Sequence, residues 1–196
     1  SGRIYLRDTD ITDLAPHRRA LLGIGRVFQN FGIFRELTLL DNILVALESR
    51  ERGILLPWSK AHRRNVSQAR EALDVVGLAH RATEKARSLS GGQMRLLEIS
   101  RSVAFGSEIF LLDEPTAGVS PKMKGDVEGI LRRLQELKKT VLIIEHDINF
   151  IQRLCDRILV LDVGKLVLDD TPERVRTDPL LQEIYFGSGN HAAAAS

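Results

Sequence analysis

Short apolar runs without polar alternation stand at residues 109–112 and 141–144, and residues 24–28, IGRVF, are a further strand candidate. An apolar run of this length is typical of a β-strand in a parallel sheet. For the runs at 109–112 and 141–144 we expect burial on both faces of the sheet. Further strands are predicted at residues 3–6, 157–161 and 165–168, the last two joined through Val163 and Gly164.

Other apolar residues recur at helical spacing, mainly between Phe34 and about Val103. Pro16 suits the first turn of a short helix running to Leu22, and Gly23 stands where a glycine often ends a helix. Ser120 and Pro121 are typical of an N-cap and the first helical residue. Further helices are predicted at 148–155 and from Thr171 onward. The chain is therefore expected to be an α/β protein.

The segment 53–60, GILLPWSK, interrupts the helical region and is punctuated by Gly53 and Pro57. Its apolar residues are Ile54, Leu55, Leu56 and Trp58. Two interpretations are open. These residues form an exposed patch that docks a partner, or they fold back onto the local helices.

Polar side chains follow the predicted strands at the points where the strands end. Asp113 and Glu114 follow 109–112, Gln29 follows 24–28, and Glu145 to Asp147 follow 141–144. Ligands of open α/β sheets bind beyond the carboxyl ends of the strands. Asp113 suits Mg²⁺, and Glu114 suits orienting or deprotonating a water that attacks a phosphate. Gln29 can offer an oxygen to a cation. Taken alone, these residues are equally consistent with solvated turns.

The string Leu89 to Gln93, LSGGQ, leads directly into a periodic helix. Ser90 is a candidate N-cap, and Gly91 and Gly92 leave backbone N–H groups open to a ligand. Free amides at the positive end of a helix dipole predict an anion site. A flexible cap is the alternative for the glycines considered alone.

The composition is that of an ordinary globular protein, with 196 residues, 43% apolar and 28% charged. The formal charge of +2 argues against a strong polyanion-binding surface, and so against nucleic acid as a partner. Cys155 is the single cysteine, which excludes an internal disulfide framework. No secretory signal or membrane-spanning apolar run is visible. The chain opens with Ser1 inside a predicted strand, so we expect the natural N-terminus to lie further upstream.

Together these motifs resemble those of an ABC transporter nucleotide-binding subunit, in the same order and at similar spacing over nearly the whole chain. The matching residues are Gln29 for the Q-loop, Leu89 to Gln93 for the signature motif, Ile109 to Glu114 for the Walker B strand, Ala117 to Ser120 for the D-loop and His146 for the H-loop. Residues 23–46, the LPW insertion, the EHD string and residues 171–187 resemble the branched-chain amino-acid branch, which includes urea importers.

This chain departs from the family pattern in several places. The family branch often has a bulkier residue at Gly91, and AGVSP stands where AGLNP is commoner. No phosphate-binding G-x-x-x-x-G-K-[ST] occurs. The resemblance places that loop just before Ser1.

The resemblance implies a P-loop NTPase (RecA-like) core, incomplete at the N-terminus, with an inserted α-helical signature subdomain. Residues 1–30 would be the N-terminal remainder of the core up to the Q-loop, and 31–103 the helical subdomain. Residues 104–170 would carry Walker B, the D-loop and the H-loop, and 171–196 a C-terminal helix and a frayed tail.

The resemblance also implies roles for the matching residues in a composite site between two head-to-tail subunits. Glu114, His146 and Gln29 are the expected catalytic residues, and Asp113 and Gln29 the expected Mg²⁺ ligands. Glu114 would polarise the water, while His146 and Gln29 would contact the γ-phosphate and its surroundings. The ATP-binding residues would be Ser90, Gly91, Gly92, Gln93, Asp113 and Ser120, with Ser90 to Gly92 facing ATP held by the opposite subunit.

The implied partners are ATP, a second ATP-binding subunit and the permease of a branched-chain amino-acid importer. The permease would dock near Gln29 and residues 31–36, which places the protein peripherally on the cytoplasmic face of the plasma (inner) membrane. Alternatives are a subunit for urea import or for lipid or lipopolysaccharide export, and a fragment that cannot itself bind and hydrolyse ATP. A DNA-repair or translation relative is disfavoured, because neither tandem cassettes nor long coiled-coil insertions are visible.

Overall fold

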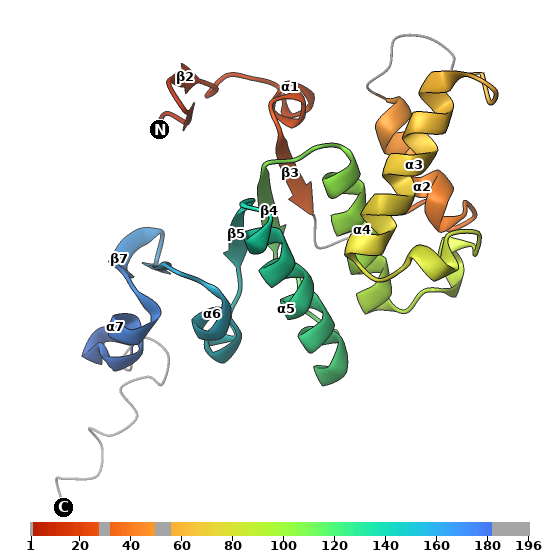
Figure 1. The fold of residues 1–196 in the computed structure, drawn as a ribbon. Helices are drawn as coiled ribbons and strands as arrows, with labels where there is room; N and C mark the ends of the chain where they lie inside the picture. Colours follow the sequence, from red (N-terminus) through yellow and green to blue (C-terminus); the bar gives the residue numbers. More distant parts are fainter. Residues whose placement is uncertain (1, 28–31, 50–55, 182–196) are drawn as a thin grey trace, which may run out of the picture. The chain divides into compact units, whose positions relative to one another are not determined.

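The computed structural model describes residues 2–27, 32–49 and 56–181. It divides into two compact units, Ser1–Ile144 and Glu145–Ser196, each of which is described here by itself (Figure 1). Within the described residues, no helix has both the length and the apolar character that crossing a membrane requires.

A parallel sheet of three strands in the order β3-β4-β5 forms the centre of the first unit. The strands are β3 (Ile24–Val27), β4 (Ile109–Asp113) and β5 (Thr140–Ile144). Val27 pairs with Leu112, and Asp113 pairs with Ile144, so the carboxyl ends of the strands meet at one edge. This arrangement confirms the strands predicted from the apolar runs.

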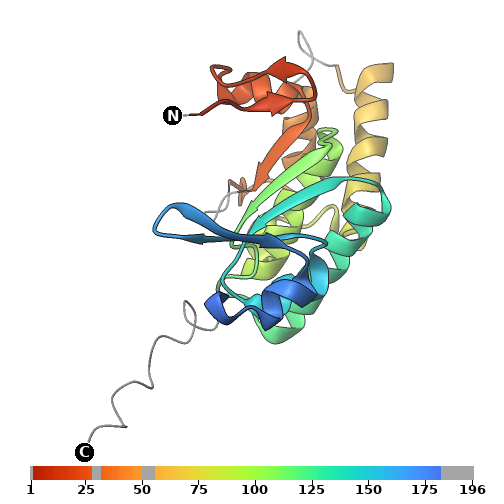
Figure 2. The ribbon, with the colours of Figure 1, turned by 90° about the vertical axis from the view of Figure 1, so that its left-hand side faces the viewer.

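Helices pack on one face of this sheet. α4 (Gly91–Ala104) packs against β3, and α5 (Pro121–Glu136) packs against β5 (Figures 1 and 2). The covered face carries Phe110 and Leu112, which are 0% and 2% exposed. Val127 and Leu131 of α5 are also buried, as the apolar spacing of that helix predicts.

The other face of the sheet contradicts the prediction of burial on both sides. Leu142 and Ile144 of β5 are 50% and 61% exposed. Ile109 and Leu111 of β4 are only half-buried. The reason is that no layer of described residues from the first unit covers this second face. An apolar run does not reveal whether such a layer is present.

The helical region comprises α2 (Leu39–Glu48), α3 (Lys60–Val75) and α4, which pack on one another. Between α3 and α4 lie two short 3₁₀ helices, η1 (Ala79–Arg81) and η2 (Ala86–Ser88). The core of this region includes the fully buried Leu39, Ile43, Leu73 and Leu97.

Leu56 and Trp58 of the 53–60 segment are exposed, at 48% and 71%. The interpretation that these two side chains fold back onto the local helices is therefore wrong. Ile54 and Leu55 lie outside the described residues.

At the N-terminal end, β1 (Tyr5–Leu6) and β2 (Thr9–Asp10) form an antiparallel pair, followed by α1 (Pro16–Leu21). Gly23 follows α1 with φ of 88°, a conformation that favours glycine, as predicted for the residue that ends this helix.

The second unit contains α6 (Ile148–Leu154), the antiparallel strands β6 (Ile158–Asp162) and β7 (Lys165–Asp170), and α7 (Pro172–Thr177). Val163 and Gly164 turn the hairpin with φ of 44° and 75°. The core of the unit includes Ile158, Val160, Val175 and Leu181.

Candidate functional site

The two acids of the central strand stand at the carboxyl edge of the sheet, as predicted. Asp113 is the last residue of β4, and Glu114 follows it with φ of 45°. The Glu114 N–H donates to the Ile144 carbonyl at 2.9 Å, and the Glu114 carbonyl accepts from the Ala117 N–H at 3.1 Å. These bonds hold Glu114 in an uncommon backbone conformation. The direction in which its side chain leaves the backbone is therefore set by the sheet and by the following turn.

Asp113 also has a partner that the sequence did not indicate. Arg26 of β3 places Nη2 3.8 Å from Asp113 Oδ2, and both side chains are partly exposed. The register explains the contact, because Arg26 pairs with Leu111 and lies on the same face as Asp113. An exposed pair of this kind contributes at most about 1 kcal/mol to stability, so Asp113 remains available to a cation.

The side chains at this edge of the sheet fit Mg²⁺, which needs few protein ligands, better than a metal ion whose ligands all come from the protein. Among the described residues, no three His, Cys, Asp or Glu side chains gather to form a metal cage. Mg²⁺ bound with a nucleotide commonly takes one or two carboxylates, the phosphates and several waters. Asp113 alone can supply such a carboxylate.

The remaining predicted members of the phosphate site are not brought together by the described structure. Gln29 lies outside the described residues. His146 belongs to the second unit, where its N–H donates to Glu145 Oε2 at 3.3 Å and its side chain is 73% exposed. The convergence of Gln29, His146, Asp113 and Glu114 on one pocket therefore stays a prediction.

Ser90 caps α4, as the sequence predicted. Its Oγ accepts from the Gln93 N–H at 3.3 Å, and its own N–H donates to Gln93 Oε1 at 3.2 Å, which completes a capping box. The N–H groups of Gly91 and Gly92 belong to the first turn and have no acceptor within the helix. Ser90 and Gly91 are exposed and Gly92 is buried, so the start of this helix reaches the surface at Ser90 and Gly91, and a helix start of this kind can bind an anion.

Gly92 is required by packing against α5. A Cβ on Gly92 would lie 2.5 Å from Met123 Cε and 3.1 Å from Met123 Cβ. Met123 is in the first turn of α5, where its N–H donates to the N-cap Ser120 Oγ at 3.4 Å. The structure thus brings Gly92 of the predicted signature motif against the first turn of α5, which Ser120 caps. The sequence suggested that Gly92 admits a ligand, but the close approach observed here is to a side chain of the same chain.

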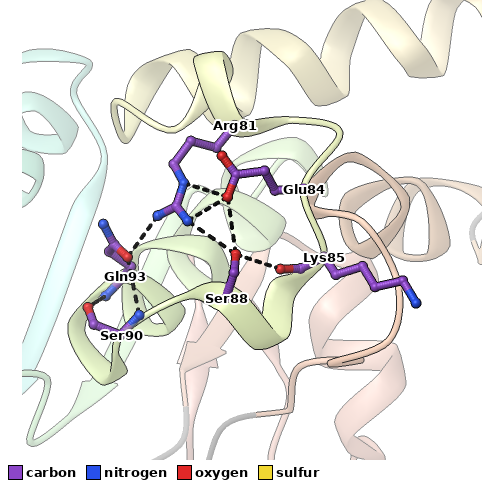
Figure 3. Close-up of polar contacts among 6 residues, drawn as sticks. All are labelled: Arg81, Glu84, Lys85, Ser88, Ser90 and Gln93. Atoms are coloured by element: carbon purple, nitrogen blue, oxygen red, sulfur yellow. Dashed lines mark hydrogen bonds and ion pairs between the residues drawn. The ribbon is translucent and has the colours of Figure 1, made fainter.

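Arg81 is a further residue of this region that was not identified from the sequence. Its Nη1 donates to Gln93 Oε1 at 2.9 Å (Figure 3). Its Nε and Nη2 donate to Glu84 Oε2 at 3.0 and 2.6 Å. The hydrogen bond to Glu84 raises the pKa of Arg81, and the same bond lowers the pKa of Glu84. The spacing of Arg81 and Glu84, three residues apart, was the only signal in the sequence.

A second polar cluster ties α4 to the segment that follows the Q-loop position. Glu98 Oε1 accepts from the Gly32 N–H at 2.7 Å, and Arg101 Nη1 donates to the Gly32 carbonyl. Glu98 also pairs with Arg95 at 2.9 Å, with side-chain exposures of 8% and 3%. Burial raises the pKa of Glu98, although the Gly32 amide and the two arginines oppose the rise. The Gly32 peptide is therefore held on both sides by the predicted signature helix.

A parallel sheet with two acids at its carboxyl edge and a glycine-rich helix start define an ATP-binding cassette. The family model for ABC transporters matches residues 1–117. The chain belongs to the ABC transporter family, whose ATP-binding subunits bind nucleotide, hydrolyse ATP and dimerise.

The relatives include subunits of importers and of an export system. The chain is 34% identical over 194 residues to the high-affinity branched-chain amino acid transport ATP-binding protein LivG of Escherichia coli K12, covering 95% of this chain and 76% of LivG. It is 36% identical to BraF of Pseudomonas aeruginosa, with the same coverage. It is 33% identical to the lipopolysaccharide export system ATP-binding protein LptB of Acidithiobacillus ferridurans, covering 95% of this chain and 74% of LptB.

Solved structures agree with this fold assignment. The ADP conformation of MJ1267, an ATP-binding cassette of an ABC transporter, superposes with a TM-score of 0.83 at 30% identity, covering 95% of this chain and 77% of that one. The ATP-binding cassette MJ0796, a dimer with ADP and phosphate bound, has a TM-score of 0.71 at 29% identity, covering 88% and 74%.

Proposed function

We propose that this chain is part of the ATPase subunit of an importer for branched-chain amino acids. The observation that carries the proposal is the fixed Asp113–Glu114 edge in a chain 34% and 36% identical to LivG and BraF. A lipopolysaccharide export system is the second candidate, because LptB is 33% identical over a similar span.

In this proposal Glu114 orients and polarises the water that attacks the γ-phosphate. Its backbone is fixed by the hydrogen bond to Ile144, and a preorganised carboxylate needs little rearrangement to align the water. Asp113 would hold Mg²⁺, which neutralises phosphate charge when bound. We expect His146 and Gln29 to contact the γ-phosphate and the attacking water, as the family resemblance implies.

The signature residues act across an interface between two subunits. Ser90 and Gly91 present a hydroxyl and a first-turn amide at the exposed start of α4, and the buried Gly92 follows in the same turn. Gln93 holds that start through the capping box. Ser120 caps the first turn of α5, whose Met123 contacts Gly92. We expect these groups to bind the γ-phosphate of ATP on the opposite subunit, so that hydrolysis lets the subunits part.

The helical region 31–103 acts as the signature subdomain and docks the permease on the cytoplasmic face of the membrane. Phe34 supports this assignment, because it is 48% exposed and stacks on Arg101 at 5.6 Å. Glu98 and Arg101 hold the Gly32 backbone and so link that surface to α4. This link offers a route by which movement could pass between the permease and the nucleotide. Residues 1–30 and 104–170 form the ATPase core, and 171–196 the C-terminal part.

The experiment is ATP-driven uptake by the full-length protein, reconstituted with its permease and substrate-binding protein in liposomes. We expect uptake of labelled leucine that needs ATP and is lost in Glu114→Gln. Labelled urea serves as the comparison substrate. ATP-dependent extraction of lipopolysaccharide without leucine uptake would establish the second candidate instead, and ATP hydrolysis coupled to neither would refute both.

A further inference from the structure

One carboxamide oxygen at the start of α4 is shared by two donors. Gln93 Oε1 accepts from the Ser90 N–H at 3.2 Å and from Arg81 Nη1 at 2.9 Å (Figure 3). The first bond belongs to the capping box and the second comes from η1, outside the helix. Gln93 is therefore held from both sides, although only the capping box is local in sequence.

Arg81 is itself fixed, so it is a rigid donor. Glu84 Oε2 accepts from Nε and Nη2, and Ser88 Oγ accepts from Nη2 at 3.1 Å. Ser88 Oγ also lies within hydrogen-bonding distance of Glu84 Oε2 at 3.1 Å and of the Lys85 carbonyl at 2.9 Å. A guanidinium presents its donors in a fixed plane, so the bonds to Glu84 and Ser88 determine where Nη1 points.

The Arg81 bond decides which end of the Gln93 amide faces Ser90. A side-chain amide has an acceptor end and a donor end of nearly equal shape. A flipped Gln93 would place its NH₂ group against the guanidinium and against the Ser90 N–H, where donors would meet donors. Arg81 thereby excludes the flipped orientation and keeps the capping box closed.

We infer that Arg81 is a positioning residue of the signature motif, acting through Gln93 on Ser90 and the first-turn amides. The inference rests on the proposed function, in which those groups bind the γ-phosphate held by the opposite subunit. Its expected contribution is to preorganisation more than to folding, since the Glu84 side chain is 45% exposed and exposed ion pairs stabilise little.

The network also balances charge beside a phosphate site. Glu84 would repel a phosphate if Arg81 were removed, so Arg81→Ala alone combines two effects. The double variant Arg81→Ala/Glu84→Gln removes the arginine without leaving a free carboxylate. Arg81→Lys keeps the charge but loses the planar set of donors. Arg157→Ala is the control for losing an arginine–carboxylate pair, because Arg157 makes two 2.6 Å bonds to Asp169 on the β6–β7 hairpin, with its side chain 70% exposed against 18% for Arg81.

The test measures two properties of the full-length protein. The first is the kcat and KM of ATP hydrolysis. The second is ATP-dependent dimerisation of the same variants in a Glu114→Gln background, followed by sedimentation velocity. We expect each of the three variants, Arg81→Ala, Arg81→Lys and Arg81→Ala/Glu84→Gln, to lower kcat and to weaken dimerisation. For the double variant, kcat should fall about tenfold. Two other quantities should stay near the values of Arg157→Ala. These are the affinity of the dilute monomer for a fluorescent ATP analogue and the midpoint of unfolding.

A double-mutant cycle with Gln93→Ala separates positioning from a direct effect of Arg81. If Arg81 acts through Gln93, Arg81→Ala/Glu84→Gln should cost nothing further in the Gln93→Ala background. If Arg81→Ala/Glu84→Gln lost as much activity in the Gln93→Ala background as in the wild-type background, the inference would be overturned. It would also be overturned if Arg81→Ala/Glu84→Gln were as active as Arg157→Ala. These outcomes leave the proposed function intact, whereas absence of ATP hydrolysis by the wild-type protein would refute the proposed function itself.

Discussion

Gly92 and Met123 are in such close contact that no side chain fits between them. A Cβ on residue 92 would lie 2.5 Å from Met123 Cε and 2.9 Å from Met123 Cγ. This contact sets the distance between the starts of α4 and α5, which carry the exposed Ser90 and Ser120. Packing of the two helices therefore brings the start of the predicted signature helix against the first turn that follows the predicted D-loop.

Gly92→Ala is expected to destabilise the protein by about 1–3 kcal/mol, because Met123 must move to admit a methyl group. Urea unfolding measures the change. Gly129→Ala is the control, since Gly129 is inside α5 with nothing within 4 Å of an added Cβ. That control should gain about 0.5–1 kcal/mol from helix propensity. Equal changes in the free energy of unfolding for the two substitutions would contradict the packing argument. Adding Met123→Ala should restore part of the stability that Gly92→Ala loses.

Replacements of Ser90 should separate its capping role from its proposed role at ATP. Ser90→Ala should cost about 0.5–2 kcal/mol of stability, whereas Ser90→Gly should cost only a few tenths. Both lose the hydroxyl, so both should hydrolyse ATP more slowly at saturating ATP. Unfolding midpoints and kcat values of the full-length variants provide the two measurements. Wild-type activity in Ser90→Gly would show that the hydroxyl serves only the helix.

Glu98 should make stability depend on pH. Burial raises the pKa of this carboxyl above its ordinary value of 4.5. The folded state therefore holds the proton more tightly than the unfolded state, and this stabilisation is lost as the pH rises from 4.5 through the folded-state pKa. Glu98→Gln does not titrate but can still accept from the Gly32 N–H.

We expect the free energy of unfolding of Glu98→Gln to rise relative to wild type between about pH 4 and pH 7. Chemical denaturation of both proteins at each pH gives the difference directly and cancels the titration of all other groups. A constant difference, or one that falls with rising pH, would show that the pairing with Arg95 outweighs burial.

Local sequence patterns predicted much of this fold and of the candidate site. The apolar runs identified β4 and β5, residues 24–28 were recognised as a strand candidate that became β3, and the rules for helix starts identified the caps Ser90 and Ser120. These features depend on neighbouring residues, so the sequence contains the information. The acids Asp113 and Glu114 were found because the end of an apolar run marks the edge of a sheet.

The failures involve contacts between distant segments. Exposure of Ile144 depends on what covers the second face of the sheet, and exposure of Trp58 depends on where its segment packs. Neither property is encoded in a local run. Arg81 was missed for the same reason, because its partner Gln93 lies twelve residues away on another element. Met123 was not identified from the sequence either, because its contact with Gly92 joins two different helices.

The most direct test of the account is ATP turnover by the full-length Glu114→Gln protein, with ATP binding measured on the same sample. We expect hydrolysis to fall to background while ATP still binds and drives the subunits into a stable dimer, because only the water loses its orienting carboxylate. Asp113→Asn serves as the comparison, and it should weaken Mg²⁺-dependent nucleotide binding as well. Near-normal hydrolysis by Glu114→Gln would contradict the role assigned to the edge of the sheet.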